Sequence, residues 1–227
     1  MTASLTLHST LIRRGDPATD SLRRALAEVP TGEYALLEAA IAWRNFRPAQ
    51  TRPSRRGGAR AQTPPTGPRY LPLAEVDDEQ VAARLCRLLS ELAWAVVTRP
   101  EPEPGSTRRR LRVEVPAPVY HLVVRALSGA LRHARRELDA DVAGSGAGVA
   151  AATWRMGLLI GGLGPSRDAI CLRTGASGTA DLLVSAAAVL GVSATVDEER
   201  GGPAVLVCQA GDVRRLLNAA VTPALVR

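Results

Sequence analysis

The sequence contains no lysine: all 29 basic residues among its 227 are arginines. A phosphate-binding loop of the form GxxxxGK[ST] requires a lysine, so that class of nucleotide site is excluded. A net charge of +7 favours an anionic partner such as nucleic acid or an anionic surface. Exclusive use of arginine beside abundant alanine is also typical of the coding bias of a high-GC bacterium. Both explanations of the basic excess stay open.

Aromatic residues are scarce, at 3% of the chain, so the core must consist of Leu, Val, Ala and Ile. A hydrophobic content of 46% with 22% charged residues is typical of a globular protein and not of a disordered one. The length allows one large domain or two small ones, with a substantial core in either case.

Cysteines are few and form no CxxC pair. Cys86, Cys171 and Cys208 each lie in an apolar stretch, which predicts reduced, buried thiols in a cytoplasmic protein. The opening MTASLTLHSTLIRRGD has no basic segment followed by an apolar one, so we expect no signal peptide. No apolar run approaches the roughly 18 to 20 residues that cross a bilayer, so we expect no membrane partner.

Segments with apolar residues at helical spacing, bounded by capping residues, glycine or proline, predict seven helical regions. They are 19–29, 33–46, 77–94, 117–138, 152–164, 179–191 and 211–221. Asp77 or Asp78 and Thr179 are the expected N-caps, and Gly129 could divide 117–138 into two helices. Runs rich in β-formers predict strands at 70–76, 94–98, 109–115, 169–174, 192–199 and 203–210.

The two halves repeat one order of elements: helix, strand region, helix, β-hairpin, helix. This order favours an internal duplication, although alternation of helices and strands is common by chance. We expect a first repeat at 1–138 with a basic Pro/Gly-rich loop at 47–69, a Gly/Ala linker at 139–151, and a second repeat at 152–227.

The stretch WRMGLLIGGLGPSRD at 154–168 raises the question of a glycine-rich cofactor loop. It does not fit the dinucleotide fingerprint, because Arg167 stands where the third glycine belongs and a strand follows. In a helix, Gly157, Gly161 and Gly164 lie on one stripe. The first half offers Ala35, Ala39 and Ala42 at the same spacing, which predicts two helices packed closely along small residues. An ordinary Ala/Gly-rich core helix is the alternative.

Three segments carry a resemblance to a known family: SLRRALAEVPTGEYALLEAAIAW at 21–43, AATWRMGLLIGGLGPSRDAICLRT at 151–174, and 180–221. The chain resembles the LAGLIDADG homing-endonuclease fold and, more narrowly, the WhiA-type sporulation and cell-division regulators of Gram-positive bacteria. The resemblance implies an α+β fold of two pseudo-symmetric α-ββ-α-ββ-α repeats, with paired central helices and a saddle-shaped antiparallel sheet. The sequence departs from the family pattern: such regulators carry a C-terminal helix-turn-helix domain, which we expect this chain to lack.

Nucleases of this fold place an acidic residue at the end of each paired helix to bind the divalent metals of phosphodiester cleavage. The corresponding ends here read AIAWRNFR and LIGGLGPS, with Asn45 and Ser166 as the nearest polar groups. His8, His121 and His133 are scattered and predict no metal cluster. We therefore expect no catalytic residue, no metal and no cofactor.

The resemblance implies a concave sheet surface that straddles duplex DNA, and arginine can hold phosphates and guanine edges there. The candidate contacts are Arg52, Arg55, Arg56 and Arg60 in the loop, Arg99, Arg108, Arg109, Arg110 and Arg112 on the first hairpin, and Arg173 in the second half. The alternative for RRRLR is a solvated hairpin edge that opposes aggregation.

The expected function is non-catalytic DNA binding or transcription regulation, with double-stranded DNA as partner and a sigma factor or regulator as a protein partner. A protein-interaction scaffold that has lost DNA binding is the alternative, and a divergent enzyme is a distant third. The oligomeric state and the DNA target sequence stay open.

Overall fold

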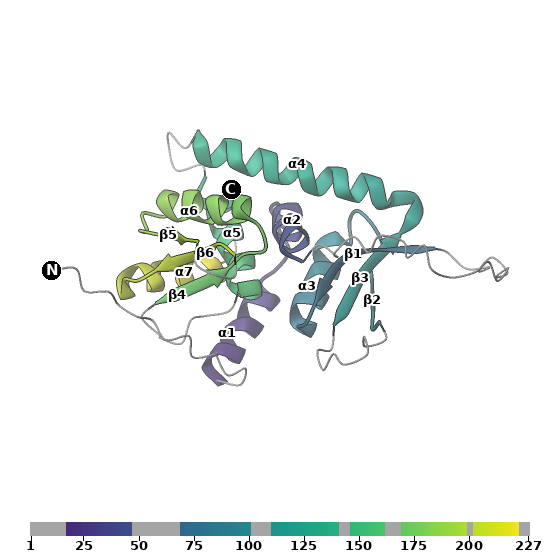
Figure 1. Cartoon of the computed structure of the whole chain (residues 1–227), viewed down its shortest axis with the longest axis horizontal. Helices are drawn as coiled ribbons and strands as arrows, with labels where there is room; N and C mark the ends of the chain where they lie inside the picture. Colours follow the sequence, from purple (N-terminus) through teal and green to yellow (C-terminus); the bar gives the residue numbers. More distant parts are fainter. Residues whose placement is uncertain are drawn as a thin grey trace.

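The structure is a computed structural model that describes residues 17–46, 69–100, 110–140, 146–161, 169–198 and 202–222. Its described elements form an α+β arrangement of two groups side by side, each a three-stranded antiparallel sheet with helices (Figure 1). The α+β class expected from the sequence is confirmed.

The first half begins with two helices and then forms a sheet of strand order β1-β3-β2. Its elements are α1 (Pro17–Glu28), α2 (Ala35–Asn45), β1 (Tyr70–Val76), α3 (Glu79–Leu89), β2 (Val96–Thr98), β3 (Leu111–Pro116), the short 3₁₀ helix η1 (Ala117–Val119) and α4 (Tyr120–Asp139). The second half repeats the strand order as β4-β6-β5. Its elements are α5 (Ala147–Gly161), β4 (Ile170–Arg173), α6 (Ser177–Val189), β5 (Thr195–Asp197), β6 (Ala204–Val207) and α7 (Ala210–Val221).

The element order from α2 to α4 therefore matches that from α5 to α7, apart from η1, as the duplication predicts. Two strands were expected after the first helix of each repeat, but the described residues there hold one, β1 and β4 respectively. The linker expected at 139–151 is too long, because α5 already begins at Ala147. Alanine favours helix, and Val149 is buried in the core, so the end of this segment joins the helix.

Local sequence explains most element boundaries. Asp78 caps α3, since its Oδ1 accepts hydrogen bonds from the backbone N–H groups of Gln80 and Val81. Gly191 has a φ of +66° just beyond α6, a left-handed conformation that suits glycine at a helix end. The expected N-cap Thr179 is wrong, because α6 starts at Ser177 and has no side-chain cap. Helix α4 runs unbroken through Gly129.

The sheets follow the alternation expected of strands with one buried face. In β3, Leu111, Val113 and Val115 are buried, while the residues between them are partly exposed. Strand β1 contains an irregularity between Pro72 and Ala74, where proline interrupts regular pairing with β3. The buried faces of both sheets belong to one continuous hydrophobic core.

Helices α2 and α5 pack against each other between the two halves, as the sequence predicts. In Figure 1, α4 runs across the top of both halves, and it contacts α2, α5 and α6. Helix α1 contacts α3 of the first half and both α5 and α7 of the second. The halves are therefore joined by one helix pair and by two further helices that span the junction.

Gly157 and Gly161 of α5 do not face α2. A Cβ atom on Gly157 would lie 2.8 Å from Leu183 of α6, and one on Gly161 would lie 2.8 Å from Leu172 of β4. Gly164 lies outside the described residues. The prediction that these glycines line the contact with α2 is therefore wrong. Their missing side chains instead leave room for core side chains of the second half, Leu183 and Leu172. On the partner helix, Ala39 and Ala42 are buried and Ala35 is half-buried.

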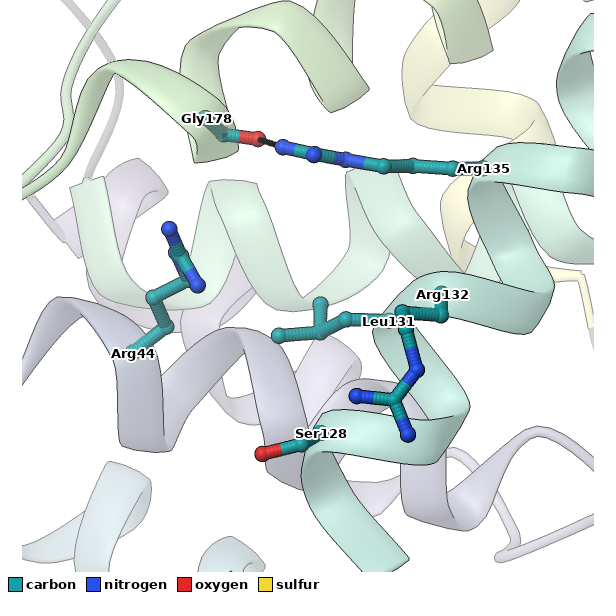
Figure 2. A pocket seen from close by; sticks show the side chains of 6 residues that line it. All are labelled: Arg44, Ser128, Leu131, Arg132, Arg135 and Gly178. Atoms are coloured by element: carbon teal, nitrogen blue, oxygen red, sulfur yellow. Dashed lines mark hydrogen bonds between the residues drawn. The ribbon is translucent and has the colours of Figure 1, made fainter. Parts of the chain in front are cut away.

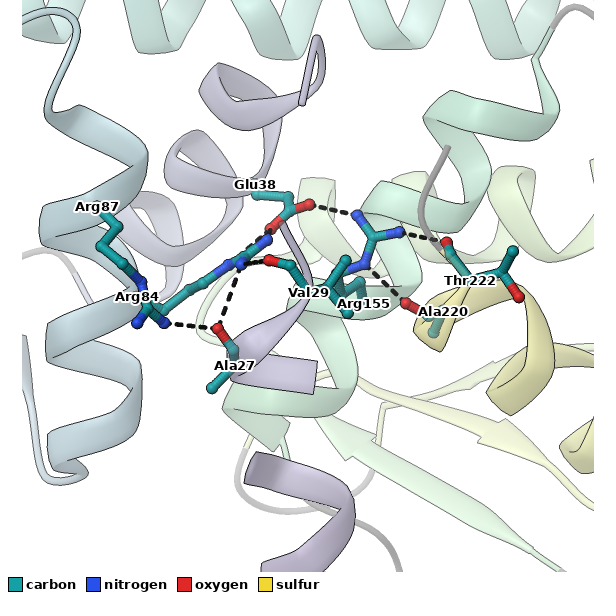
Figure 3. Close-up of polar contacts among 8 residues, drawn as sticks. All are labelled: Ala27, Val29, Glu38, Arg84, Arg87, Arg155, Ala220 and Thr222. Carbon is teal, nitrogen blue, oxygen red and sulfur yellow. Dashed lines mark hydrogen bonds and ion pairs between the residues drawn. The ribbon is translucent and has the colours of Figure 1, made fainter. Parts of the chain in front are cut away.

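The contact between α2 and α5 includes a buried ion-pair network centred on Glu38 (Figure 3). One carboxylate oxygen of Glu38 accepts hydrogen bonds from Nε and Nη2 of Arg84 in α3, at 3.2 and 2.7 Å. The other accepts one from Nη1 of Arg155 in α5, at 2.5 Å. One carboxylate therefore joins three helices and both halves of the chain.

The network carries two arginines and one carboxylate, so a positive charge remains to be stabilised. Arg84 donates to the carbonyl oxygens of Ala27 and Val29, at the C-terminal end of α1. Arg155 donates to those of Ala220 and Thr222, at the C-terminal end of α7. Helix C-termini present unpaired carbonyls and the negative end of the helix dipole, so they favour cations there.

We predict that Glu38→Gln lowers the free energy of unfolding by about 3–5 kcal/mol, because it leaves two buried arginines without a counter-charge. Chemical denaturation followed by circular dichroism measures this loss. The matched control is Glu79→Gln, which breaks the 2.7 Å pair with Arg99 whose side chains are 74% and 75% exposed. The control should cost less than about 1 kcal/mol. Equal effects of the two substitutions would contradict the role assigned to Glu38.

Candidate nucleic-acid interface

The C-terminal end of α2 is where the nucleases that the sequence resembles carry an acidic metal ligand. Asn45 occupies this end, and both of its polar side-chain atoms are engaged. Its Nδ2 donates to the carbonyl oxygen of Ile41 at 2.8 Å, and its Oδ1 accepts from the backbone N–H of Gly175 at 2.8 Å. The side chain therefore joins α2 to the turn between β4 and α6 of the other half.

The approach at this contact is close. A Cβ atom on Gly175 would lie 2.7 Å from the backbone oxygen of Asn45 and 3.4 Å from its Cα.

The equivalent residue Ser166 of the second half lies outside the described residues. Within the six described ranges, no three His, Cys, Asp or Glu side chains cluster as they would to hold a metal ion.

The predicted DNA-contacting arginines of the first sheet lie beside carboxylates. Glu75 of β1 is the cross-strand partner of Arg112 and accepts from its Nε and Nη2 at 3.1 and 2.7 Å. Arg110 approaches the same carboxylate at 3.4 Å, and Arg99 pairs with Glu79. Glu114 is two residues from Arg112, so it lies on the same face of β3. The described strands of the first sheet and these flanking residues therefore carry no net positive charge.

The other predicted contacts divide into two groups. Arg173 is exposed on β4, with Ala204 opposite it on β6. The remaining candidates, Arg52, Arg55, Arg56, Arg60, Arg108 and Arg109, lie outside the described residues. Arg173 therefore belongs to the second sheet and Arg110 and Arg112 to the first half, and the DNA-contact surface stays a prediction.

A second group of arginines was missed by the sequence reasoning. Arg44 at the end of α2 and Arg132 and Arg135 of α4 line one pocket against the start of α6 (Figure 2). The run RHARREL places Arg132, Arg135 and Arg136 at helical spacing, which predicts a basic helix face. That Arg44 joins this face follows from the packing of α4 on α2, which local sequence does not reveal.

The cysteines and the described histidines are spread over both halves of the chain. All three cysteines are free thiols, but Cys208 is exposed and the other two are half-buried, so their full burial was wrongly expected. Burial raises the pKa of the Cys86 thiol and of the Cys171 thiol. His133 pairs with Glu137 at 3.0 Å on the surface of α4 and His121 is exposed, as expected of helix-surface residues.

No helix in the described ranges is long and apolar enough to span a membrane.

Two solved structures share the fold of this chain. One is the N-terminal LAGLIDADG domain of DUF199/WhiA, with a TM-score of 0.57 and 13% identity, covering 95% of this chain and 97% of that one. The other is full-length DUF199/WhiA from Thermatoga maritima, with a TM-score of 0.57 and 12% identity, covering 88% of this chain and 60% of that one. No family model matches the sequence, and no curated protein matches it. The chain therefore has the LAGLIDADG fold of the WhiA domain, as the resemblance predicted.

We predict that Gly175→Ala lowers the free energy of unfolding by about 1–3 kcal/mol, because the new methyl group meets a backbone atom of α2 that no side-chain rotation can move. The matched control is Gly129→Ala in the middle of α4, where nothing lies within 4 Å of the added Cβ. It should stabilise the protein by about 0.5–1 kcal/mol, since alanine favours helix over glycine. Urea denaturation of both variants measures the difference. A Gly175→Ala variant as stable as the wild type would show that the end of α2 does not lie against this turn.

Proposed function

We propose that this chain is a non-cleaving, duplex-DNA-binding protein that acts in transcription regulation. The observation that carries the proposal is the end of α2, where Asn45 stands in place of an acidic metal ligand and bonds Ile41 and Gly175 with its side chain. A neutral amide with its donor and its acceptor both occupied by backbone groups is a poor ligand for a divalent cation. Asn45 therefore stabilises the contact between α2 and the second half, and it is not suited to hold a metal ion for phosphodiester cleavage.

Binding of DNA is supported by the fold and by the charge of the chain. Each half of the chain contributes a three-stranded sheet, the two halves meet at the α2–α5 helix pair, and the chain carries a net charge of +7. Arg110 and Arg112 share the carboxylate of Glu75, and Glu114 lies on the same face of β3, so this cluster is balanced and the positive charge must come from other arginines of the chain. The arginines of 47–69 and those between β2 and β3 in the sequence contribute further positive charge to the first half of the chain. We therefore expect contacts with phosphates to supply most of the affinity.

A protein partner is the second candidate, favoured by one feature of the surface. Trp94 is 78% exposed just before β2, and Leu92 and Val97 beside it are 38% and 44% exposed. Exposed tryptophan is enriched among residues that anchor protein–protein interfaces. A regulator or sigma factor could use this patch with or without DNA. Under this alternative the arginine-rich hairpin is a solvated edge.

Fluorescence anisotropy with a labelled duplex, repeated over a range of salt concentrations, tests DNA binding. We expect binding at low salt that weakens at least about tenfold between roughly 50 and 200 mM salt, because bound protein releases counterions from the phosphates. Replacing Arg108, Arg109 and Arg110 together by alanine should lower the salt slope by about 2–3. The matched control is Arg214→Ala on α7, which should leave the slope within about 1 of the wild-type value.

Two results would count against the proposal. Absence of binding at low salt would contradict DNA recognition and favour the interaction scaffold. Cleavage of the duplex in the presence of Mg²⁺ or Mn²⁺ would contradict the non-catalytic assignment.

A separate experiment tests regulation of transcription. We expect the wild-type chain, and not the triple arginine variant, to change transcript levels in its host.

A further inference from the structure

The pocket between α2, α4 and α6 has a volume of about 200 Å³ and is lined by Arg44, Ser128, Leu131, Arg132, Arg135 and Gly178 (Figure 2). Three of these six residues are arginines, and none of the described residues that line the pocket is acidic. All three arginines are exposed, so a solute can reach them from solvent. This is a different arrangement from the first sheet, where Glu75 and Glu79 accompany the arginines.

Two of the guanidinium groups converge at Gly178, near the start of α6. Nη2 of Arg135 donates to the carbonyl oxygen of Gly178 at 2.8 Å. A methyl group at Gly178 would lie 2.6 Å from Nη2 of Arg135 and 3.4 Å from Nη2 of Arg44. In the ranges that the structure describes, the side chains of Arg44 and Arg132 have no ion pair or hydrogen bond. Arg44 and Arg135 thus place two positive charges near one point, while the Arg132 guanidinium lies toward Ser128 in the same pocket (Figure 2).

This arrangement is unfavourable by itself, and a bound anion would stabilise it. Like charges a few ångströms apart repel each other, and no carboxylate of the pocket lining offsets them. An oxyanion would accept charge-assisted hydrogen bonds from the guanidinium groups. The Ser128 hydroxyl offers a further donor, and the first turn of α6 adds the positive end of a helix dipole. Leu131 forms an apolar floor that holds no competing acceptor.

We propose that this pocket binds a phosphate group through Arg44, Arg132 and Arg135. Several guanidinium donors match the several oxygens of a phosphate, which is the oxyanion that arginine clusters recognise most commonly in proteins. The group could belong to a small phosphate-bearing solute or to the backbone of duplex DNA. Only the second source rests on the proposed function.

The first arm of the test uses inorganic phosphate as the probe, with the full chain and without DNA. The thermal midpoint is measured at rising phosphate concentration, with chloride replaced so that ionic strength stays constant. Phosphate also stabilises proteins by exclusion from their surface, and that effect rises without saturation. We expect in addition a saturable rise, with a dissociation constant on the order of 1 mM.

The variants are Arg44→Gln and Arg132→Gln, because neither side chain forms a hydrogen bond or ion pair that the fold would lose. Each should weaken phosphate binding about tenfold, as expected for one charge-assisted hydrogen bond. The control is Arg214→Gln on α7, which removes the same charge from an exposed helix position outside the pocket lining and should bind phosphate as the wild type does. A wild-type curve without saturation, or equal binding by all variants, would overturn the proposal.

The second arm separates the two sources by DNA anisotropy at fixed salt. If the pocket holds a backbone phosphate, Arg132→Gln weakens DNA binding more than Arg214→Gln does, and inorganic phosphate competes with the duplex. If the pocket serves a separate solute, Arg132→Gln and Arg214→Gln weaken DNA binding equally, while phosphate binding is still weakened about tenfold in Arg132→Gln and unchanged in Arg214→Gln. Saturable phosphate binding without any DNA binding would refute the proposed function and leave the pocket assignment supported.

Discussion

The rest of this structure depends on the buried ion pairs that the Glu38 carboxylate forms with two arginines. The carboxylate accepts from Arg84 of the first half and from Arg155 of the second, and those arginines in turn bond the ends of α1 and α7. A buried ion pair is costly unless its remaining donors are satisfied. Here backbone carbonyls at two helix ends satisfy them, so the network holds α2 and α5 together and fixes both outer helices.

The helix pair held in this way determines what the protein can do at its centre. Because α2 lies against the second half, Asn45 bonds the turn at Gly175. The same packing brings Arg44, one residue earlier, to the pocket shared with α4 and α6. Arginine thus has three roles in the fold: buried in the Glu38 network, paired with carboxylates on the first sheet, and grouped without a counter-charge at the pocket.

Sequence alone predicts the elements and their duplication well, because these depend on local spacing and capping. Asp78 is an N-cap, and the two central helices pack together as predicted. It fails where the environment of a side chain is set by distant residues. The sequence predicts that Gly157 of α5 packs against α2. In the structure, Arg155 is on the face of α5 that contacts α2, and Gly157, two residues further along the helix, lies on the opposite face. In each case the decisive neighbour comes from a different element of the fold. Arg112 of β3 pairs with Glu75 of β1, and Glu38 of α2 pairs with Arg155 of α5. Arg44 of α2 joins a pocket lined mainly by α4.

The central claim is that the Glu38 network and the helix pair around it make the two halves one cooperative unit. Native-state hydrogen exchange of the full chain measures this directly, by comparing the slowest-exchanging amides of α2 with those of α5. The account predicts that both sets exchange through global unfolding, with the same free energy of opening and the same dependence on denaturant. A free energy of opening for one helix lower than for the other by more than about 1 kcal/mol would show that the halves unfold separately, and would contradict the account.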